Sequence, residues 1–144
     1  MSIDLEPGPA NPVHVTRTGP GTFTGHNPRG ATVQLSASGV PGEYFTPGEL
    51  LKVALAACSA VTAEAPLARA LGGDFDLEVR AAAESVDRRY PAILEQLIVD
   101  LSGLDDATRE RVLTVVARAI DGYCTVGRTL EAGATVTLEI QPEV

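Results

Sequence analysis

The first part of the chain alternates between apolar and polar positions in short runs. These runs occupy Val13–Arg17, Thr22–Thr24 and Ala31–Leu35, and Gly and Pro residues separate them at 19–21 and 27–30. A period of two, broken by turn residues, is typical of β-strands joined by tight turns. The pattern therefore predicts a three-stranded meander.

A long apolar stretch follows and starts with residues that begin helices. Thr46 supplies a cap oxygen, Pro47 fits the first helical position, and Glu49 can reach back to the Thr46 N–H. The apolar positions after it surround the helix axis, which predicts a helix buried in a core or a subunit interface. They are Leu50, Leu51, Val53, Ala54, Leu55, Ala57, Cys58, Val61 and Ala65. We expect this helix to run to Leu71, with Pro66 kinking or splitting it and Gly72 and Gly73 ending it.

The second half of the chain predicts two strands, a helix and a last strand. Strand-like runs at 75–84 and 93–102 flank a turn at 87–91. A helix should begin at Asp105 and Asp106 and end at 122–124, because its apolar residues recur at helical spacing. Residues 134–140 alternate as a final strand. The predicted fold class is α+β with the order βββ-α-ββ-α-β, forming a single domain over 13–144 behind a flexible arm at 1–12.

Charge and composition exclude several classes of function. The chain has 144 residues and a net charge of −8, so nucleic acid and anionic membranes are poor partners. The longest mostly apolar run, Val53–Val61, is too short to span a bilayer, and the first residues lack the pattern of a signal peptide. We therefore expect a cytoplasmic protein.

The candidate chemistry rests on two cysteines and one glutamate. Two cysteines suffice neither for a secreted disulfide framework nor for a four-ligand zinc site, and neither histidine has a ligand at metal-binding spacing. Cys58 is either a small apolar residue of its helix or a reactive thiol. Cys124 is either packed at a helix end or activated there, since a helix N-terminus with Arg128 nearby lowers a thiol pKa. Glu49 either caps the helix only or also serves a site. No metal or cofactor motif is present, and Ser59 has no base partner visible in the sequence.

Two segments resemble the cysteine motifs of the OsmC/Ohr family. The first is Thr46–Leu51 followed by Ala54–Ala60, which is similar to the family pattern on its central helix. The second is Tyr123–Leu130, which is similar to the second cysteine motif. Their order, with matching elements between them, extends the resemblance over about residues 13 to 140.

The resemblance implies a thiol peroxidase for organic hydroperoxides in oxidative stress defence, built as an intertwined homodimer with a buried central helix. Cys58 would match the attacking cysteine, Cys124 the resolving cysteine, and Glu49 the glutamate that orders the site. The reductant would be a dithiol, of lipoyl type in this family. The chain has Thr125 where many members have Pro, and Arg17 is the nearest candidate for the arginine of the family's N-terminal strands.

Two other functions fit the same residues. A thiol-based redox sensor of this fold would be oxidised once without turnover, and a small-ligand binding protein would carry its cysteines as structural residues. Turnover of hydroperoxide separates the three.

Overall fold

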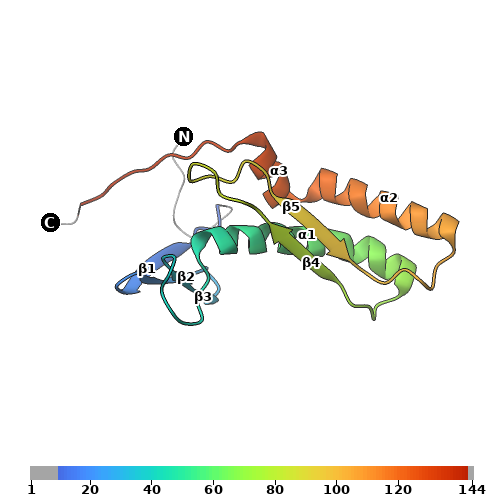
Figure 1. Ribbon diagram of the computed structural model, residues 1–144, viewed down its shortest axis with the longest axis horizontal. Coiled ribbons are helices and arrows are strands. Elements are labelled where there is room, and N and C mark those ends of the chain that lie inside the picture. Colours follow the sequence, from blue (N-terminus) through green and yellow to red (C-terminus); the bar gives the residue numbers. More distant parts are fainter. Residues whose placement is uncertain (1–9, 143–144) are drawn as a thin grey trace. The chain divides into compact units, whose positions relative to one another are not determined.

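The computed structural model describes residues 10–142, which belong to two compact units that divide between Leu51 and Lys52 (Figure 1). The predicted arm at 1–12 lies almost entirely outside the described residues. The single domain over 13–144 stays a prediction.

The first unit contains the meander that the alternating pattern predicts. Strands β1 (His14–Gly19), β2 (Thr22–His26) and β3 (Thr32–Ser36) form an antiparallel sheet in chain order. In β2, Gly25 pairs with Val33, and a Cβ there would lie 2.9 Å from the Val33 side chain. A larger residue at this position would therefore displace the Val33 side chain. Phe45 extends the sheet, because it exchanges backbone hydrogen bonds with Gln34 and Ser36 just before the long helix.

Helix α1 (Pro47–Leu71) starts with the predicted capping box. The Thr46 N–H donates to Glu49 Oε1 at 2.9 Å, and the Glu49 N–H donates to Thr46 Oγ1 at 3.2 Å. Two of the backbone groups that a helix start leaves unpaired are satisfied in this way. The helix ends at Gly72, whose φ of +85° suits glycine. Pro66 lies inside the helix and is buried, but the helix is continuous, so the expected split is wrong.

The part of α1 in the second unit buries one face and exposes another. Leu55, Ser59, Ala63, Pro66 and Leu67 are buried, whereas most of the exposed positions, such as Val53 and Val61, are apolar. By length and composition α1 is long enough to cross a membrane, which corrects the expectation drawn from the shorter apolar run. A core helix of a globular protein meets the same criterion, so this property carries no conclusion about membranes.

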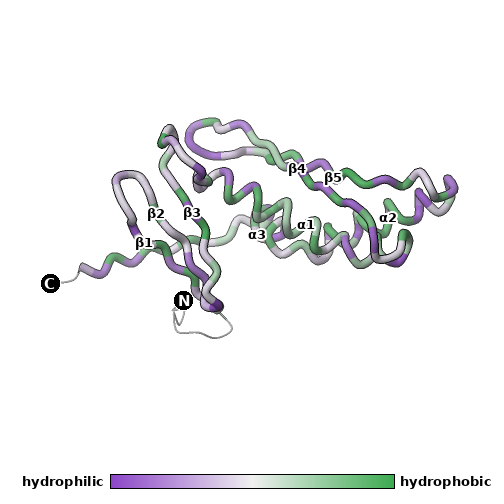
Figure 2. Tube along the Cα trace, turned by 90° about the horizontal axis from the view of Figure 1, so that it is seen from below, coloured by the Kyte–Doolittle hydropathy of each residue, from purple (hydrophilic) through white to green (hydrophobic). Residues whose placement is uncertain are grey.

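The second unit places a two-stranded sheet against helices. Strands β4 (Glu78–Ala82) and β5 (Leu94–Ile98) pair antiparallel, and Figure 2 shows them on one side of α1 and α2. Both strands are shorter than predicted. The turn between them holds Asp87 and Arg88 at positive φ, bridged by Val86 and Arg89. The buried core joins α1, α2 and the segment after β5 through Ala63, Leu67, Leu101, Val112 and Val116.

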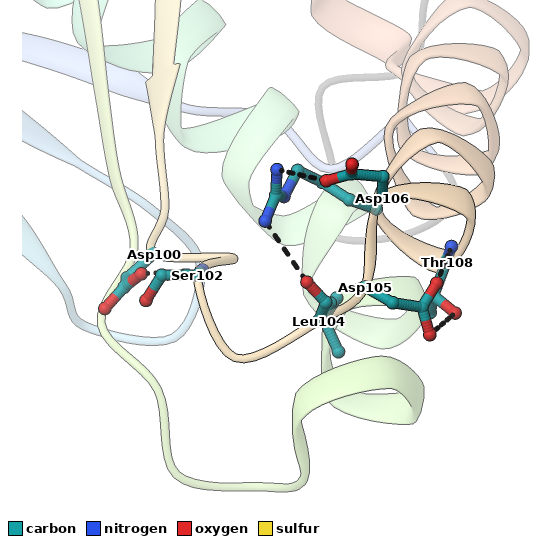
Figure 3. Close-up of polar contacts among 7 residues, drawn as sticks. Asp100, Ser102, Leu104, Asp105, Asp106 and Thr108 are labelled. Carbon is teal, nitrogen blue, oxygen red and sulfur yellow. Dashed lines mark hydrogen bonds and ion pairs between the residues drawn. The ribbon is translucent and has the colours of Figure 1, made fainter.

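Helix α2 (Asp106–Tyr123) begins and ends where the sequence predicts. Asp105 caps it by accepting from the Thr108 N–H at 2.8 Å (Figure 3). Nearby, Asp100 accepts from the Ser102 N–H, and Arg109 donates to the Leu104 carbonyl. These contacts hold the connection from β5 into α2.

The end of the chain differs from the prediction. After α2, helix α3 (Thr125–Ala132) ends at Gly133 in the left-handed conformation. Residues 134–142 form no strand, although apolar side chains alternate along them at Val136, Leu138 and Ile140. The predicted strand at 134–140 is therefore wrong for the single chain. A strand needs a hydrogen-bonding partner, and none pairs with this segment among the described residues.

Candidate functional site

Cys58 lies on the part of α1 that belongs to the second unit. Its side chain is half-buried, and its thiol is free. The Cys58 carbonyl accepts a hydrogen bond from the Thr62 hydroxyl at 2.8 Å, so the hydrogen of that hydroxyl is used within the helix. Cys58 is therefore the cysteine of the pair that molecules from solvent can reach.

Cys124 forms the junction between α2 and α3. Its N–H donates to the Ile120 carbonyl at the end of α2, and its carbonyl accepts from the Arg128 N–H at the start of α3. These two hydrogen bonds fix the residue between two helices. Its side chain is 2% exposed, so its thiol is isolated from water.

The structure brings the two predicted cysteines together. Burial raises the pKa of the Cys124 thiol, and hydrogen bonding and charge interaction with the neighbouring Cys58 raise it further. The Gly127 N–H lowers this pKa in part, without reversing the shift. Of the two alternatives for Cys124, the raised pKa agrees with a cysteine packed at a helix end, because loss of hydration outweighs the effect of the helix N-terminus. Arg128 does not contribute, and its guanidinium donates to the Gly122 carbonyl instead.

Ser59 connects Cys124 to a carboxylate. The Ser59 hydroxyl donates to Glu95 Oε1 at 2.7 Å, and its oxygen lies 3.8 Å from Cys124 Sγ. Ser59 is 2% exposed, whereas Glu95 on β5 is half-buried. Sequence reasoning missed this base partner of Ser59. The available signal was a carboxylate at position 95, which shares the inward face of β5 with Leu97.

Gly127 leaves room beside the Cys124 sulfur. A Cβ at this position would lie 3.3 Å from Cys124 Sγ and 3.5 Å from Leu55 Cδ1. The contact with Leu55 is an ordinary one, but the contact with the sulfur is tight enough that the thiol would have to move by a few tenths of an ångström. The absence of a side chain at Gly127 therefore helps to place the sulfur beside α1.

The other predicted residues belong to the first unit. Glu49 lies in the first turn of α1, where the Thr46 N–H is one of its contacts. Arg17 lies on β1 opposite Phe23. The two histidines stack with ring centroids 4.5 Å apart. Within residues 10–142, no group of three or more His, Cys, Asp or Glu side chains is arranged to hold a metal ion.

The arrangement in the second unit has a defined chemical capacity. Two free thiols lie side by side, one half-buried and one buried. A thiol oxidised to sulfenic acid condenses with a neighbouring thiol to form a disulfide. The Ser59 hydroxyl lies beside the buried thiol and is hydrogen-bonded to the Glu95 carboxylate.

Comparisons with known proteins agree with this architecture. The OsmC-like protein family model matches residues 40–139. An uncharacterized protein of Mycobacterium tuberculosis is 49% identical over 128 residues, which covers 88% of this chain and 93% of the relative.

Solved structures show the same fold. An OsmC-like protein from Mycoplasma pneumoniae superposes with a TM-score of 0.59 at 13% identity, covering 85% of this chain and 88% of the other. The organic hydroperoxide resistance protein of Bacillus subtilis superposes with a TM-score of 0.53 at 19% identity, covering 83% and 89%. Since the family model spans most of the chain and includes both cysteines, the protein belongs to the OsmC-like family.

Proposed function

We propose that the protein is a thiol peroxidase that reduces organic hydroperoxides, with Cys58 as the attacking and Cys124 as the resolving cysteine. The observation that carries the proposal is the pairing of a half-buried thiol with a buried one. Membership of the OsmC-like family and the likeness to a hydroperoxide resistance protein support it.

The order of the two cysteines follows from their surroundings. A peroxide must reach the attacking sulfur, and Cys58 is the more exposed of the two. The attacking sulfur must also be a thiolate. The raised pKa of Cys124 keeps its thiol protonated, which makes it a poor nucleophile for the first step. Cys124 therefore suits the second step.

The reaction proceeds in three stages. The Cys58 thiolate attacks the distal oxygen of ROOH, the O–O bond breaks, and RO⁻ takes a proton and leaves as ROH. Cys124 then loses its proton and attacks the sulfur of the Cys58 sulfenic acid, the S–O bond breaks, and the leaving hydroxide takes up a proton to become water. A dithiol of lipoyl type returns two electrons and two protons by thiol–disulfide exchange. The proposal includes the cytoplasm as the location, because a dithiol stays reduced in that compartment.

The surroundings of the thiols favour apolar substrates. Leu55 is buried one turn before Ser59, and most side chains on this part of α1 are Ala, Leu or Val. Apolar surface binds an alkyl or lipid chain more favourably than water. We therefore expect alkyl and lipid hydroperoxides to react faster than hydrogen peroxide.

The proposal also includes Glu49 as a residue that orders the site, beyond its capping role.

The proposal includes a homodimer. Val61 on α1 is 73% exposed, and Val136, Leu138 and Ile140 are each at least 80% exposed. Apolar surfaces of this kind mark interaction sites. A second copy of the chain would cover α1 and provide a strand edge for residues 134–140, where the alternating pattern predicts a strand.

Turnover of cumene hydroperoxide with dihydrolipoamide as reductant tests the function. The wild type should consume many equivalents per chain, and Cys58→Ser should consume none. If the wild type is oxidised once and then stops, it acts as a redox sensor. If both thiols remain unchanged, the peroxidase and sensor functions are excluded, and small-ligand binding is the remaining function.

A further inference from the structure

Only one neighbour of the Cys124 thiol among the described residues can take up its proton. The thiol is 2% exposed, so bulk water cannot accept its proton. Its neighbours are the Cys58 sulfur, the Gly127 N–H and the Ser59 hydroxyl. An N–H cannot accept a proton, and Cys58 is the atom under attack when Cys124 reacts. Ser59 is therefore the neighbour through which the proton can leave.

Ser59 alone is a poor base, but it is hydrogen-bonded to a carboxylate. Its hydroxyl has a single hydrogen, which points to Glu95 Oε1 at 2.7 Å. The Ser59 oxygen is then free to accept from the Cys124 S–H, 3.8 Å away between the heavy atoms. Glu95 is half-buried, so its carboxylate lies between the buried pair and solvent.

We propose that Ser59 and Glu95 form a proton relay that activates Cys124 for disulfide formation, with Glu95 as a positioning residue that acts through Ser59. This inference rests on the proposed peroxidase function. It assigns a role in that reaction to two residues other than the two cysteines.

The relay balances in atoms and charge. As Cys124 Sγ bonds to the sulfur of the Cys58 sulfenic acid, its proton moves to Ser59 Oγ and the Ser59 proton moves to Glu95. The S–O bond breaks, and the leaving hydroxide, released at the half-buried Cys58, takes up a proton from solvent to become water. Glu95 then releases its proton to solvent, so that the net reaction is sulfenic acid plus thiol to disulfide plus water.

Glu95→Gln tests the relay because the amide still accepts a hydrogen bond from Ser59 but takes up no proton. Each protein is mixed with one equivalent of cumene hydroperoxide, and the Cys58 sulfenic acid and the disulfide are followed by rapid quench and mass spectrometry, with dimedone as the sulfenic acid trap. We expect sulfenic acid to form at the wild-type rate and the disulfide to form about 100-fold more slowly, a typical loss for a missing general base.

Three further variants complete the design. Ser59→Ala should behave like Glu95→Gln, and Glu95→Asp should recover part of the disulfide rate because it restores a carboxylate. Glu64→Gln, the same substitution at an exposed position of α1, should match the wild type. Circular dichroism and thermal melting confirm that each variant is folded.

The possible outcomes distinguish failure of the relay from failure of the proposed peroxidase function. If Glu95→Gln and Ser59→Ala form the disulfide at the wild-type rate, or slow both steps equally, the relay is wrong while the peroxidase proposal stands. If the wild type forms neither sulfenic acid nor disulfide, the proposed function fails, and the relay fails with it.

Discussion

The thiols of Cys58 and Cys124 are neighbours, although 65 residues separate them in the sequence. Helix α1 carries one, and the junction of α2 and α3 carries the other. Because one thiol is half-buried and the other buried, the pair is chemically asymmetric. This asymmetry underlies the predictions below.

Alkylation should distinguish the two thiols. Burial raises the pKa of Cys124 and keeps reagents away from its sulfur. Each pKa unit of that rise lowers the fraction of thiolate at neutral pH about tenfold. In the folded protein, iodoacetamide should therefore label Cys58 well before Cys124, and labelling of Cys124 should accelerate as the pH rises and its thiol loses the proton. In denaturant both should react at similar rates. Equal rates in the folded protein would contradict the asymmetry.

Gly127→Ala should slow disulfide formation. The added methyl group would lie 3.3 Å from Cys124 Sγ and displace the sulfur. Gly122→Ala is the matched control, since nothing lies within 4 Å of a Cβ there. Both substitutions favour the helix by about 1 kcal/mol, so thermal melting should show the full gain only for Gly122→Ala. Identical oxidation kinetics in the two variants would remove Gly127 from the site.

Glu49→Gln separates capping from a role in the site. The amide oxygen can still accept from the Thr46 N–H, so the loss of stability should stay within about 1 kcal/mol. If Glu49 orders the site as proposed, turnover should fall far more than the loss of folded protein explains. Glu43→Gln, at an exposed position in the preceding loop, provides the control. Unchanged turnover would leave Glu49 with its capping role only.

Light scattering should show a dimer at micromolar concentration. Val61→Glu places a charge on the exposed apolar face of α1 and should shift the mass toward the monomer, because burying an unpaired charge is costly. Ala117→Glu, at an exposed position of α2, should leave the dimer intact. A monomeric wild type would contradict the proposed assembly.

Local sequence signals predicted much of the fold because local chemistry determines those elements. Thr46 and Glu49 form the capping box that their spacing predicts. Asp105 caps α2, and the three short alternating runs form the meander. Each of these depends on residues close together in the chain.

Features that depend on contacts between distant parts of the chain could not be predicted from the sequence. Ser59 and Glu95 are 36 positions apart, and nothing local shows that β5 places the carboxylate against α1. The position of Cys124 at a helix N-terminus was predicted, but the sequence could not decide between a packed and an activated thiol, because the burial that raises its pKa comes from distant residues. The alternation of residues 134–140 predicts a strand, yet strand formation also requires a partner edge.

Oxidation of the wild type by one equivalent of an organic hydroperoxide tests the central claim most directly. Peptide mapping by mass spectrometry should find an intramolecular link between Cys58 and Cys124, while Cys124→Ser should stop at the sulfenic acid of Cys58. If neither cysteine is modified while the protein stays folded, the redox function of this pair is contradicted.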